Sequence, residues 1–267
     1  MKKKILIVIF LLSSFSYLQE SQPFPPLDII SIPTAGTLPK GTYVFETLFS
    51  GEGNILPEFL LGITDNFSMG FSFGVQGFIG AEEIKKNKSA PEINLKYRVY
   101  EENEFFPAIT IGFDTQGRGS YNKNNERYDQ KAMGLYIVAS RNWSALGNLG
   151  LHVGINKNIV EVNDKDEDLN LFIGIDKEIN RSFSFLAEYN FARNDDELVS
   201  TEGLSLRDGK GYLNLGLRWS ATENLLLELN FNDNLKNIKY LNQNDLENSN
   251  TFKSEHRELK VIYVEQF

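Results

Sequence analysis

Apolar and polar side chains alternate along most of this chain. From about Thr42 to Phe267, roughly twelve segments of strand length carry their apolar side chains mostly on odd-numbered positions. Successive side chains of a β-strand point to opposite faces of a sheet, so this period of two predicts strands with one apolar and one polar face. The predicted strands are 42–50, 54–63, 67–76, 91–100, 105–113, 132–142, 148–158, 168–178, 182–192, 211–220, 224–232 and 256–267.

The connections between these strands alternate in length. One set is short, at 64–66, 101–104, 143–147, 179–181 and 221–223. The other set is mostly long and polar, at 77–90, 114–131, 159–167, 193–210 and 233–255, with 51–53 as the short exception. Short turns at one end and long loops at the other are typical of outer-membrane barrels, and an even strand number places both termini at the periplasmic, short-turn end.

Aromatic side chains gather at both ends of the predicted strands. The short-turn ends carry Phe67, Tyr100, Phe105, Phe106, Trp143, Phe183, Trp219 and Phe267, and the long-loop ends carry Phe49, Phe73, Phe113, Tyr189, Phe191 and Phe231. Two aromatic rings that bracket Leu, Ile and Val match the girdles of a membrane barrel. We therefore predict an all-β fold, a transmembrane antiparallel β-barrel of about twelve strands, with a soluble secreted sandwich as the alternative.

The first residues have the pattern of a secretory signal peptide. Lysines at 2–4 precede an apolar run at 5–12 that is too short to span a membrane, and small residues then predict cleavage after Ser16, with Ser21 as the alternative. The predicted signal peptide is therefore 1–16. Together with the barrel pattern, it predicts the outer membrane of a diderm bacterium as the location.

A proline-rich segment follows at 22–40. It holds five of the eight prolines, which are Pro23, Pro25, Pro26, Pro33 and Pro39. Proline favours extended backbone at its own position and at the one before it, so we predict an extended periplasmic arm ahead of a barrel at 41–267. The arm either enters the lumen as a plug or hangs below the barrel.

Composition narrows the classes of function. The hydrophobic fraction of 41% and the mean hydropathy of −0.30 are those of a soluble protein, but alternating strands average to such values in a membrane barrel too. The net charge of −9 argues against nucleic acid as a partner. The absence of cysteine excludes disulfides, thiol chemistry and a lipoprotein anchor.

The inward face of the predicted barrel carries most of the candidate functional residues. The lumen-lining candidates are Glu46, Glu58, Lys96, Arg98, Asp114, His152, Asp176, Glu188, Arg218 and Glu228. They predict either a charged channel lining, whose acidic excess favours cations, or a salt-bridged lumen that braces a closed barrel. Inward glycines, such as Gly62 and Gly174, indicate space for long side chains from across the lumen or tight local curvature.

Catalytic and metal sites are not evident in the sequence. His152 faces the lumen beside Asn148, Asn156 and Asn158, and no serine nucleophile stands at a suitable spacing from it. His256 lies near the outer end of the last strand. The run Asp164, Asp166 and Asp168 lacks the glycine and the later glutamate of a calcium loop and is interpreted as solvated. We predict no catalytic, cofactor-binding or metal-binding residues and no enzyme activity.

The predicted partners are components of the envelope. Lys85, Lys86 and Lys88 in the first long loop are either a solvated tip or a contact for lipopolysaccharide phosphates, beside the lipid of the outer membrane. The last strand, Leu259 to Phe267 with Tyr263 on its apolar row, resembles the C-terminal signal read by the barrel-assembly machinery. Glu265 departs from that signal, which usually has an apolar residue there.

One stretch resembles a known family. The entry Ile32-Pro33-Thr34-Ala35-Gly36-Thr37-Leu38-Pro39-Lys40-Gly41-Thr42, the hairpin from Leu61 to Gly74 and the stretch from Ile109 to Gly117 resemble the YjbH-like outer-membrane barrels. The resemblance implies a role in export or envelope assembly, linked in some members to exopolysaccharide. We therefore predict a narrow channel or porin-like protein of unknown solute, and the resemblance implies a link to envelope polysaccharide. The first alternative is a non-conducting structural or assembly barrel, and the less favoured one is an outer-membrane hydrolase.

Overall fold

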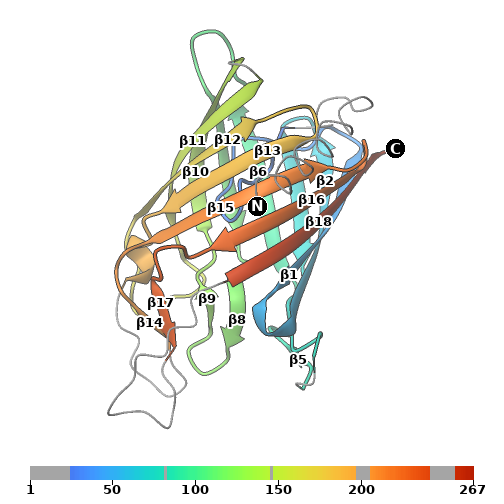
Figure 1. The fold of residues 1–267 in the computed structure, drawn as a ribbon. Coiled ribbons are helices and arrows are strands. Elements are labelled where there is room, and N and C mark those ends of the chain that lie inside the picture. Colours follow the sequence, from blue (N-terminus) through green and yellow to red (C-terminus); the bar gives the residue numbers. More distant parts are fainter. Residues whose placement is uncertain (1–24, 81–82, 145–146, 197–204, 241–255) are drawn as a thin grey trace, which may run out of the picture.

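The computed structural model of this chain is a closed antiparallel β-barrel (Figure 1). It describes residues 25–80, 83–144, 147–196, 205–240 and 256–267, so the predicted signal peptide and the asparagine-rich stretch 242–250 lie outside the described residues. Within them, twelve strands form the wall, and β1 closes it by pairing with both β2 and β18. The wall strands are β1 (Thr42–Ser50), β2 (Asn54–Thr64), β3 (Phe67–Ser72), β6 (Glu92–Tyr100), β7 (Ala108–Asp114), β10 (Gly134–Ser144), β11 (Asn148–Lys157), β12 (Asn170–Glu178), β13 (Phe183–Asn190), β15 (Tyr212–Ser220), β16 (Leu225–Asn232) and β18 (His256–Gln266).

Shorter elements lie at the long-loop end of the barrel (Figure 1). They are β4 (Val75–Gln76), β5 (Lys85–Lys86), β8 (Arg118–Asn122), β9 (Arg127–Gln130), β14 (Ser205–Arg207) and β17 (Ile238–Tyr240), with the 3₁₀ turns η1 (Gly51–Gly53) and η2 (Arg193–Asp195). The strands pair as β4 with β5, β8 with β9 and β14 with β17. In the described part of the chain, neither helical turn has the length or the apolar character needed to cross a membrane.

The predicted fold class is confirmed, and most strands lie within a few residues of their predicted bounds. The predicted strand 67–76 is the largest difference, because β3 ends at Ser72. Beyond it the backbone turns toward Asn87, whose N–H donates to the carbonyl oxygen of Gly74 at 3.0 Å. A Cβ at Gly74 would lie 2.0 Å from Nδ2 of Asn87, so the side chain of Asn87 occupies this space.

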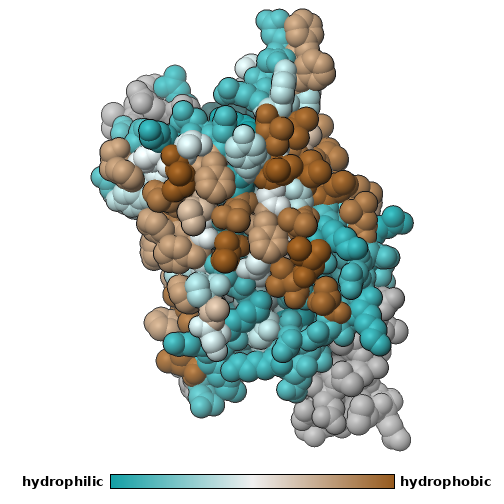
Figure 2. Space-filling model, turned by 180° about the vertical axis from the view of Figure 1, so that it is seen from behind, coloured by the Kyte–Doolittle hydropathy of each residue, from teal (hydrophilic) through white to brown (hydrophobic). Residues whose placement is uncertain are grey.

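The period of two sorts the side chains between the two faces of the wall. On β12 the odd-numbered Leu171, Ile173 and Ile175 are 38%, 37% and 40% exposed, whereas the even-numbered Phe172 is 1% exposed. Ile63 on β2 belongs to the same outward row and is 39% exposed. Figure 2 shows hydrophobic side chains gathered across the wall and hydrophilic ones toward the long-loop end. An apolar outer surface of this kind is the lipid-facing band of a membrane barrel.

Candidate functional site: an occupied barrel lumen

Residues 25–40 lie inside the barrel. They enter from the short-turn end, because β1 begins there beside the C-terminal end of β18. Of the two alternatives for the proline-rich segment, the structure has the one in which it enters the lumen, and residues 22–24 lie outside the described residues. Apolar side chains account for this position, since each one buried contributes about 1.5–3 kcal/mol relative to exposure. The completely buried ones are Ile29, Ile30, Ile32 and Leu38.

The tip of this inserted segment is a tight turn. Asp28 and Pro33 pair across it, and the N–H of Ile29 donates to the carbonyl oxygen of Ile32 at 3.0 Å. In the described residues, no backbone–backbone hydrogen bond joins 25–38 to a wall strand. The segment is thus folded on itself and held by wall side chains.

Wall glycines make room for the inserted segment. A Cβ at Gly174 would lie 2.7 Å from Cδ1 of Ile32, and a Cβ at Gly62 would lie 2.0 Å from the carbonyl oxygen of Pro39. Real Cβ atoms do not approach other atoms this closely. At these two positions the space is therefore taken by the chain's own N-terminal residues and not by side chains from the opposite wall.

Glu188 on β13 binds the turn from the wall. Its carboxylate accepts the backbone N–H groups of Ile30, Ser31 and Ile32 at 2.9, 3.0 and 3.1 Å. The hydroxyl of Ser31 and the side-chain amide of Asn214, at 2.7 Å, also donate to it. A buried carboxylate needs such donors to offset its lost hydration, so Glu188 and the turn satisfy each other.

Three wall cations bind the other polar groups of the segment. Arg218 on β15 donates to the carbonyl oxygens of Asp28 and Ile29 at 3.1 and 3.3 Å. Lys260 on β18 lies 2.7 Å from Oδ2 of Asp28, and Lys96 on β6 donates to a backbone carbonyl of the same segment. Wall strands on several sides of the lumen therefore hold one short stretch of chain.

A hydrogen-bonded chain links the segment to β10, β11 and β12. The N–H of Ala35 donates to Oγ of Ser140 at 2.8 Å, and that hydroxyl lies 2.7 Å from Nδ1 of His152. Nε2 of His152 lies 2.7 Å from Oδ1 of Asp176. A serine does stand beside His152, so the sequence prediction was wrong on this point. Its oxygen is buried beneath the inserted segment, which gives the chain of groups a structural role.

The long loop after β7 covers the other end of the lumen. Its hairpin β8–β9 carries Arg118, which donates to Glu258 at 2.9 Å and to the carbonyl oxygen of Ile30. Tyr128 on β9 is buried, and its hydroxyl donates to Glu92 at 3.0 Å. The lumen is therefore filled from both ends, and the two insertions meet at Arg118.

Charged loop residues form a buried cluster beyond this hairpin. Arg127 lies 2.7 Å from Asp164 and 2.5 Å from Asp195. Lys131 lies 2.6 Å from Asp164, and Arg207 lies 3.3 Å from Asp195. Burial by itself raises the pKa of Asp195. The nearby charges of Arg207 and Arg127 together outweigh this effect, so the pKa lies below its ordinary value. The cluster joins the hairpin to loops from other parts of the chain.

Two predictions for the long loops need correction. The run 164–168 is not a uniformly solvated loop, because Asp164 is paired as above and Asp166 is buried, whereas Asp168 is exposed. Lys85 and Lys86 are exposed, but Lys88 lies 2.5 Å from Glu92. The hairpin β8–β9 is the reason in both places. Its Arg127 pairs with Asp164, and the rings of Tyr121 and Tyr128 lie beside Lys88, whereas the sequence pattern places these side chains in solvent.

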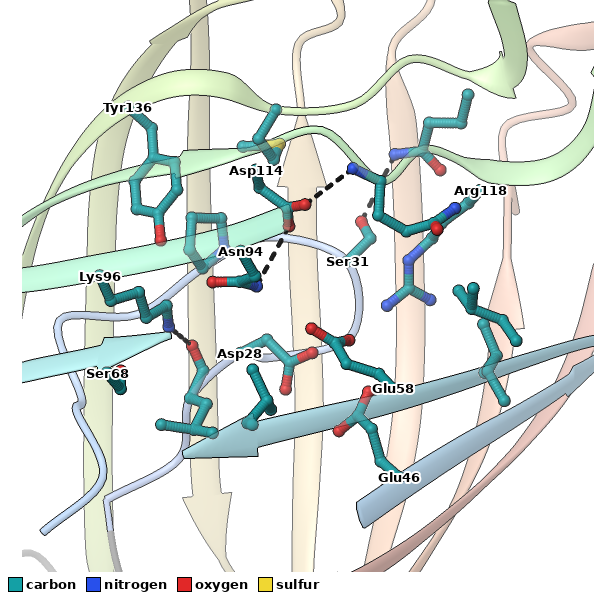
Figure 3. Close-up of a pocket in the computed structure, with 18 of the residues that line it drawn as sticks. Asp28, Ser31, Glu46, Glu58, Ser68, Asn94, Lys96, Asp114, Arg118 and Tyr136 are labelled. Carbon is teal, nitrogen blue, oxygen red and sulfur yellow. Dashed lines mark hydrogen bonds between the residues drawn. The ribbon is translucent and has the colours of Figure 1, made fainter. Parts of the chain in front are cut away.

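A small cavity remains between the two insertions (Figure 3). Its volume is about 80 Å³. Asp28, Glu46 and Glu58 point toward one another at one side, and Asp114 and Arg118 lie beside them (Figure 3). This cavity is therefore small, and charged groups are prominent in its lining.

The sequence-predicted lumen residues are found in two places. Arg98 lies at the short-turn rim, where it donates to the carbonyl oxygen of Asp65 at 3.0 Å and to Asn66. The others lie around the filled lumen, and these are Glu46, Glu58, Lys96, Asp114, His152, Asp176, Glu188, Arg218 and Glu228. The side chain of His256 lies outside the described part.

Sequence reasoning missed Ser140 and Arg118. Ser140 lies directly opposite His152 in the structure because β10 continues to Ser144. Counting outward from the predicted turn at 143–147 instead pairs Ser140 with Gly150, so the predicted register is two residues off. Arg118 gives no such signal, because its place depends on a long loop that folds back into the lumen.

Comparisons with solved structures support the same architecture. The KdgM porin matches 83% of this chain and 98% of its own with a TM-score of 0.51 at 10% identity. The KdgM porin in complex with disordered oligogalacturonate gives a TM-score of 0.49 at 10% identity over 83% and 98% of the two chains, and the NanC porin gives 0.41 at 9% over 84% and 99%. No protein-family model and no curated protein matches this chain. The chain thus has the fold of an outer-membrane porin.

Proposed function

We propose that this chain is a porin-like channel of the outer membrane, closed here by its own residues 25–40. The observation that carries the proposal is the way this segment is held. Every hydrogen bond that joins 25–38 to the rest of the described chain involves a side chain, whereas the N–H of Gly41, at the hinge, donates to the carbonyl oxygen of Gly62 at 3.0 Å. Moving the segment would break side-chain contacts and leave the hydrogen bonds of the sheet intact.

The wall does not need the segment in order to remain a barrel. Every backbone group that spans a membrane must be satisfied internally, and the closed ladder of this wall does so. About eight strands give an interior that side chains fill, whereas sixteen leave an aqueous channel. A twelve-strand wall is wider than its own side chains fill, so an emptied lumen would be a narrow aqueous path.

The lumen charge favours small cations or neutral polar solutes. Carboxylates outnumber cations among the described wall residues that face it. The carboxylates are Glu46, Glu58, Glu92, Asp114, Asp176, Glu188, Glu228 and Glu258, and the cations are Lys96, Arg218 and Lys260. The YjbH-like resemblance, and with it the link to envelope polysaccharide, stays a prediction. Export to the outer membrane by means of a cleaved signal peptide also stays a prediction.

We propose further that the barrel is not a hydrolase. Ser140 and His152 have the connectivity of a nucleophile and its base, but the serine oxygen already accepts the N–H of Ala35 at 2.8 Å. A serine-reactive fluorophosphonate should therefore leave the folded protein unlabelled. Labelling that disappears in Ser140→Ala would contradict this.

Conductance of a locked and an unlocked barrel tests the channel. The chain contains no cysteine, and a Cβ at Gly174 would lie 2.9 Å from Cγ1 of Ile29, so Ile29→Cys and Gly174→Cys can form a disulfide once the flexible end of the Ile32 side chain, 2.7 Å from that Cβ, moves aside. We expect openings from the reduced double variant in a planar bilayer, cation preference in a KCl gradient, and loss of the openings on oxidation. Each single-cysteine variant is the matched control.

Two outcomes would argue against the channel. If folded wild-type and reduced protein never conduct, the barrel is a non-conducting envelope component, which is the alternative favoured by the two insertions in the lumen. If oxidation changes nothing although the disulfide has formed, the solute path does not depend on residues 25–40.

A further inference from the structure

Side chains of the lumen bind the backbone of the inserted segment. Between residues 27 and 35 they accept hydrogen bonds from four backbone N–H groups and donate to six backbone carbonyl oxygens. The N–H groups are those of Ile30, Ser31, Ile32 and Ala35, and the carbonyl oxygens are those of Leu27, Asp28, Ile29, Ile30, Thr34 and Ala35. These contacts follow the peptide groups of the segment, which almost every residue carries.

The side chains that bind the segment are sorted by charge. On the N–H side, the carboxylate of Glu188 accepts three consecutive groups at 2.9, 3.0 and 3.1 Å. On the carbonyl side, the charged donors are Lys96, Arg118 and Arg218. The two sides meet at Ala35, whose N–H donates to Oγ of Ser140 at 2.8 Å and whose carbonyl oxygen accepts the hydroxyl of Thr110 at 2.9 Å. Acceptors on one side and donors on the other match the single donor and the single acceptor of each peptide unit.

An apolar pocket receives the side chains on either side of Ser31. Ile30 and Ile32 are completely buried. A Cβ at Gly216 would lie 3.1 Å from Cδ1 of Ile30, and one at Gly174 would lie 2.7 Å from Cδ1 of Ile32, so both glycines leave space for a branched side chain. The wall side chains of the same apolar cluster are Ala108, Met133, Tyr136, Val138, Phe172 and Leu186. A saccharide offers hydroxyl donors but no side chain for this pocket, whereas an apolar peptide offers both kinds of group.

Removal of the segment would leave the wall groups without these partners. Glu188 is only 2% exposed, and a carboxylate in such a place is costly without hydrogen-bond donors. Water in an emptied lumen can supply donors, but it does not fill the apolar pocket favourably. A solute with N–H groups, carbonyl oxygens and apolar side chains replaces the contacts of the segment together.

We propose that the solutes of this channel are short peptides with apolar side chains, and that residues 27–35 occupy the lumen as a mimic of such a peptide. A solute tripeptide takes the place of residues 30–32, with its N–H groups on Glu188 and a carbonyl oxygen on Arg118. The acidic excess of the wall favours peptides that are neutral or basic. This substrate class rests on the proposed channel function, because a peptide reaches Glu188 only when the segment has moved aside.

Displacement of the segment by an added peptide tests the proposal. The reporter is the single cysteine of Ile29→Cys in the refolded full-length protein in detergent, which reacts with a maleimide when the segment leaves the lumen. The probe is isoleucyl-seryl-isoleucine, blocked as its N-acetyl dimethylamide so that only its backbone N–H groups remain. A ligand that binds only the open state increases the population of that state, so the rate should rise roughly tenfold at ten times the dissociation constant of the peptide.

The matched control is the same blocked tripeptide with every backbone nitrogen methylated. It keeps the carbonyl oxygens and the side chains but has no N–H group for Glu188, so we expect it to leave the rate nearly unchanged. Because it is the more apolar of the two, uptake into the detergent does not explain a larger effect of the unmethylated peptide. Blocked valyl-alanyl-leucine should act like the first probe, since the lumen binds the backbone, and maltotriose should have no effect.

Two variants in the Ile29→Cys background locate the site. In Glu188→Gln the rate without peptide is higher, and added peptide should raise it by a much smaller factor, because the amide accepts fewer N–H groups. Glu265→Gln changes an exposed carboxylate near the rim and should respond to the peptide like its parent.

Four outcomes decide the matter. An equal rise with the methylated peptide or with maltotriose overturns the proposal, because the lumen then does not select peptide N–H groups. If Ile29→Cys does not form a barrel, the wild-type current in a planar bilayer decides, since only the unmethylated peptide should interrupt it. A protein that conducts but responds to no peptide keeps the channel and loses this substrate class. A peptide-dependent rate in a protein that never conducts keeps the peptide site and removes the channel.

Discussion

Individual side chains of the wall hold the inserted segment. Glu188 is the central one, because a single carboxylate binds three consecutive backbone N–H groups of the turn at Ile30, Ser31 and Ile32. Hydrogen bonds to a charged group contribute about 1.5–3 kcal/mol each, and they are not additive. A neutral residue of the same shape would keep some of the geometry and lose the charge.

Glu188→Gln should therefore loosen the segment without unfolding the barrel. The amide can offer one oxygen to the turn, and its NH₂ group opposes the N–H donors. We expect a single cysteine at Ile29→Cys to react with a maleimide at least tenfold faster in this background. A loss of about 1.4 kcal/mol in the free energy that favours the inserted state of the segment already gives that factor. Glu265→Gln, an exposed carboxylate near the rim, is the control and should leave the rate unchanged. Equal rates in both backgrounds would mean that Glu188 does not hold the turn.

Among the elements, the hairpin β8–β9 covers the lumen at the long-loop end of the barrel. Arg127 on β9 connects it to Asp164 and to Asp195 of η2, and all three side chains are buried. Removing one partner of a buried ion pair leaves an uncompensated charge and typically costs about 3–5 kcal/mol. The hairpin therefore depends on residues that are far from it in sequence.

Asp195→Asn should release the hairpin from the loops around it. The pKa of Asp195 lies below its ordinary value, so the contribution of the carboxylate is fully present above about pH 4 and is lost only as the pH falls through the lowered pKa. We expect hydrogen exchange of residues 127–131 to be unchanged between pH 7 and pH 5 in the wild type, after correction for intrinsic rates. The same residues should exchange faster in Asp195→Asn at both pH values. Wild-type protection that disappears between pH 7 and pH 5 would contradict the assignment.

At the scale of the whole molecule, the strand pairing of the barrel does not include the inserted segment. The wall is closed by strand pairing from β1 to β18, and residues 25–38 take no part in that pairing. The strand pairing of the wall is therefore complete without these residues, although Ile29, Ile30, Ile32 and Leu38 pack against its inward side chains. On the proposed function, the insertions decide whether a solute can pass.

An internal deletion of residues 27–38 tests this separation. The shortened protein should still refold in detergent and migrate differently before and after heating on a gel, as a closed barrel does. It should conduct more than the wild type, because the short-turn half of the lumen is then empty. A variant with a flexible glycine–serine stretch of equal length in place of 27–38 is the control for chain length. Failure of both proteins to form a barrel would show that the segment is part of the fold.

Much of the wall was predictable from local patterns, for a physical reason. A strand presents alternate residues to lipid and to the lumen, so the pattern in β12 alone, with Leu171, Ile173 and Ile175 outward, shows both faces. Short turns bring neighbouring strands together, but the pair Ser140 and His152 also depends on where β10 ends, which the predicted bounds miss by two residues. These relations are local, since each involves one strand or one hairpin.

The contents of the lumen follow from contacts between distant parts of the chain. Glu188 meets Ile30 across 158 residues, and Lys260 meets Asp28 across 232 residues. No local pattern distinguishes a proline-rich segment that hangs below a barrel from one that fits inside it, because the fit depends on wall glycines and charges brought together by closure. The alternation of side chains thus accounts for the twelve-strand wall, whereas closing that wall creates the interior in which residues 25–40, Arg118 and the carboxylates find their partners.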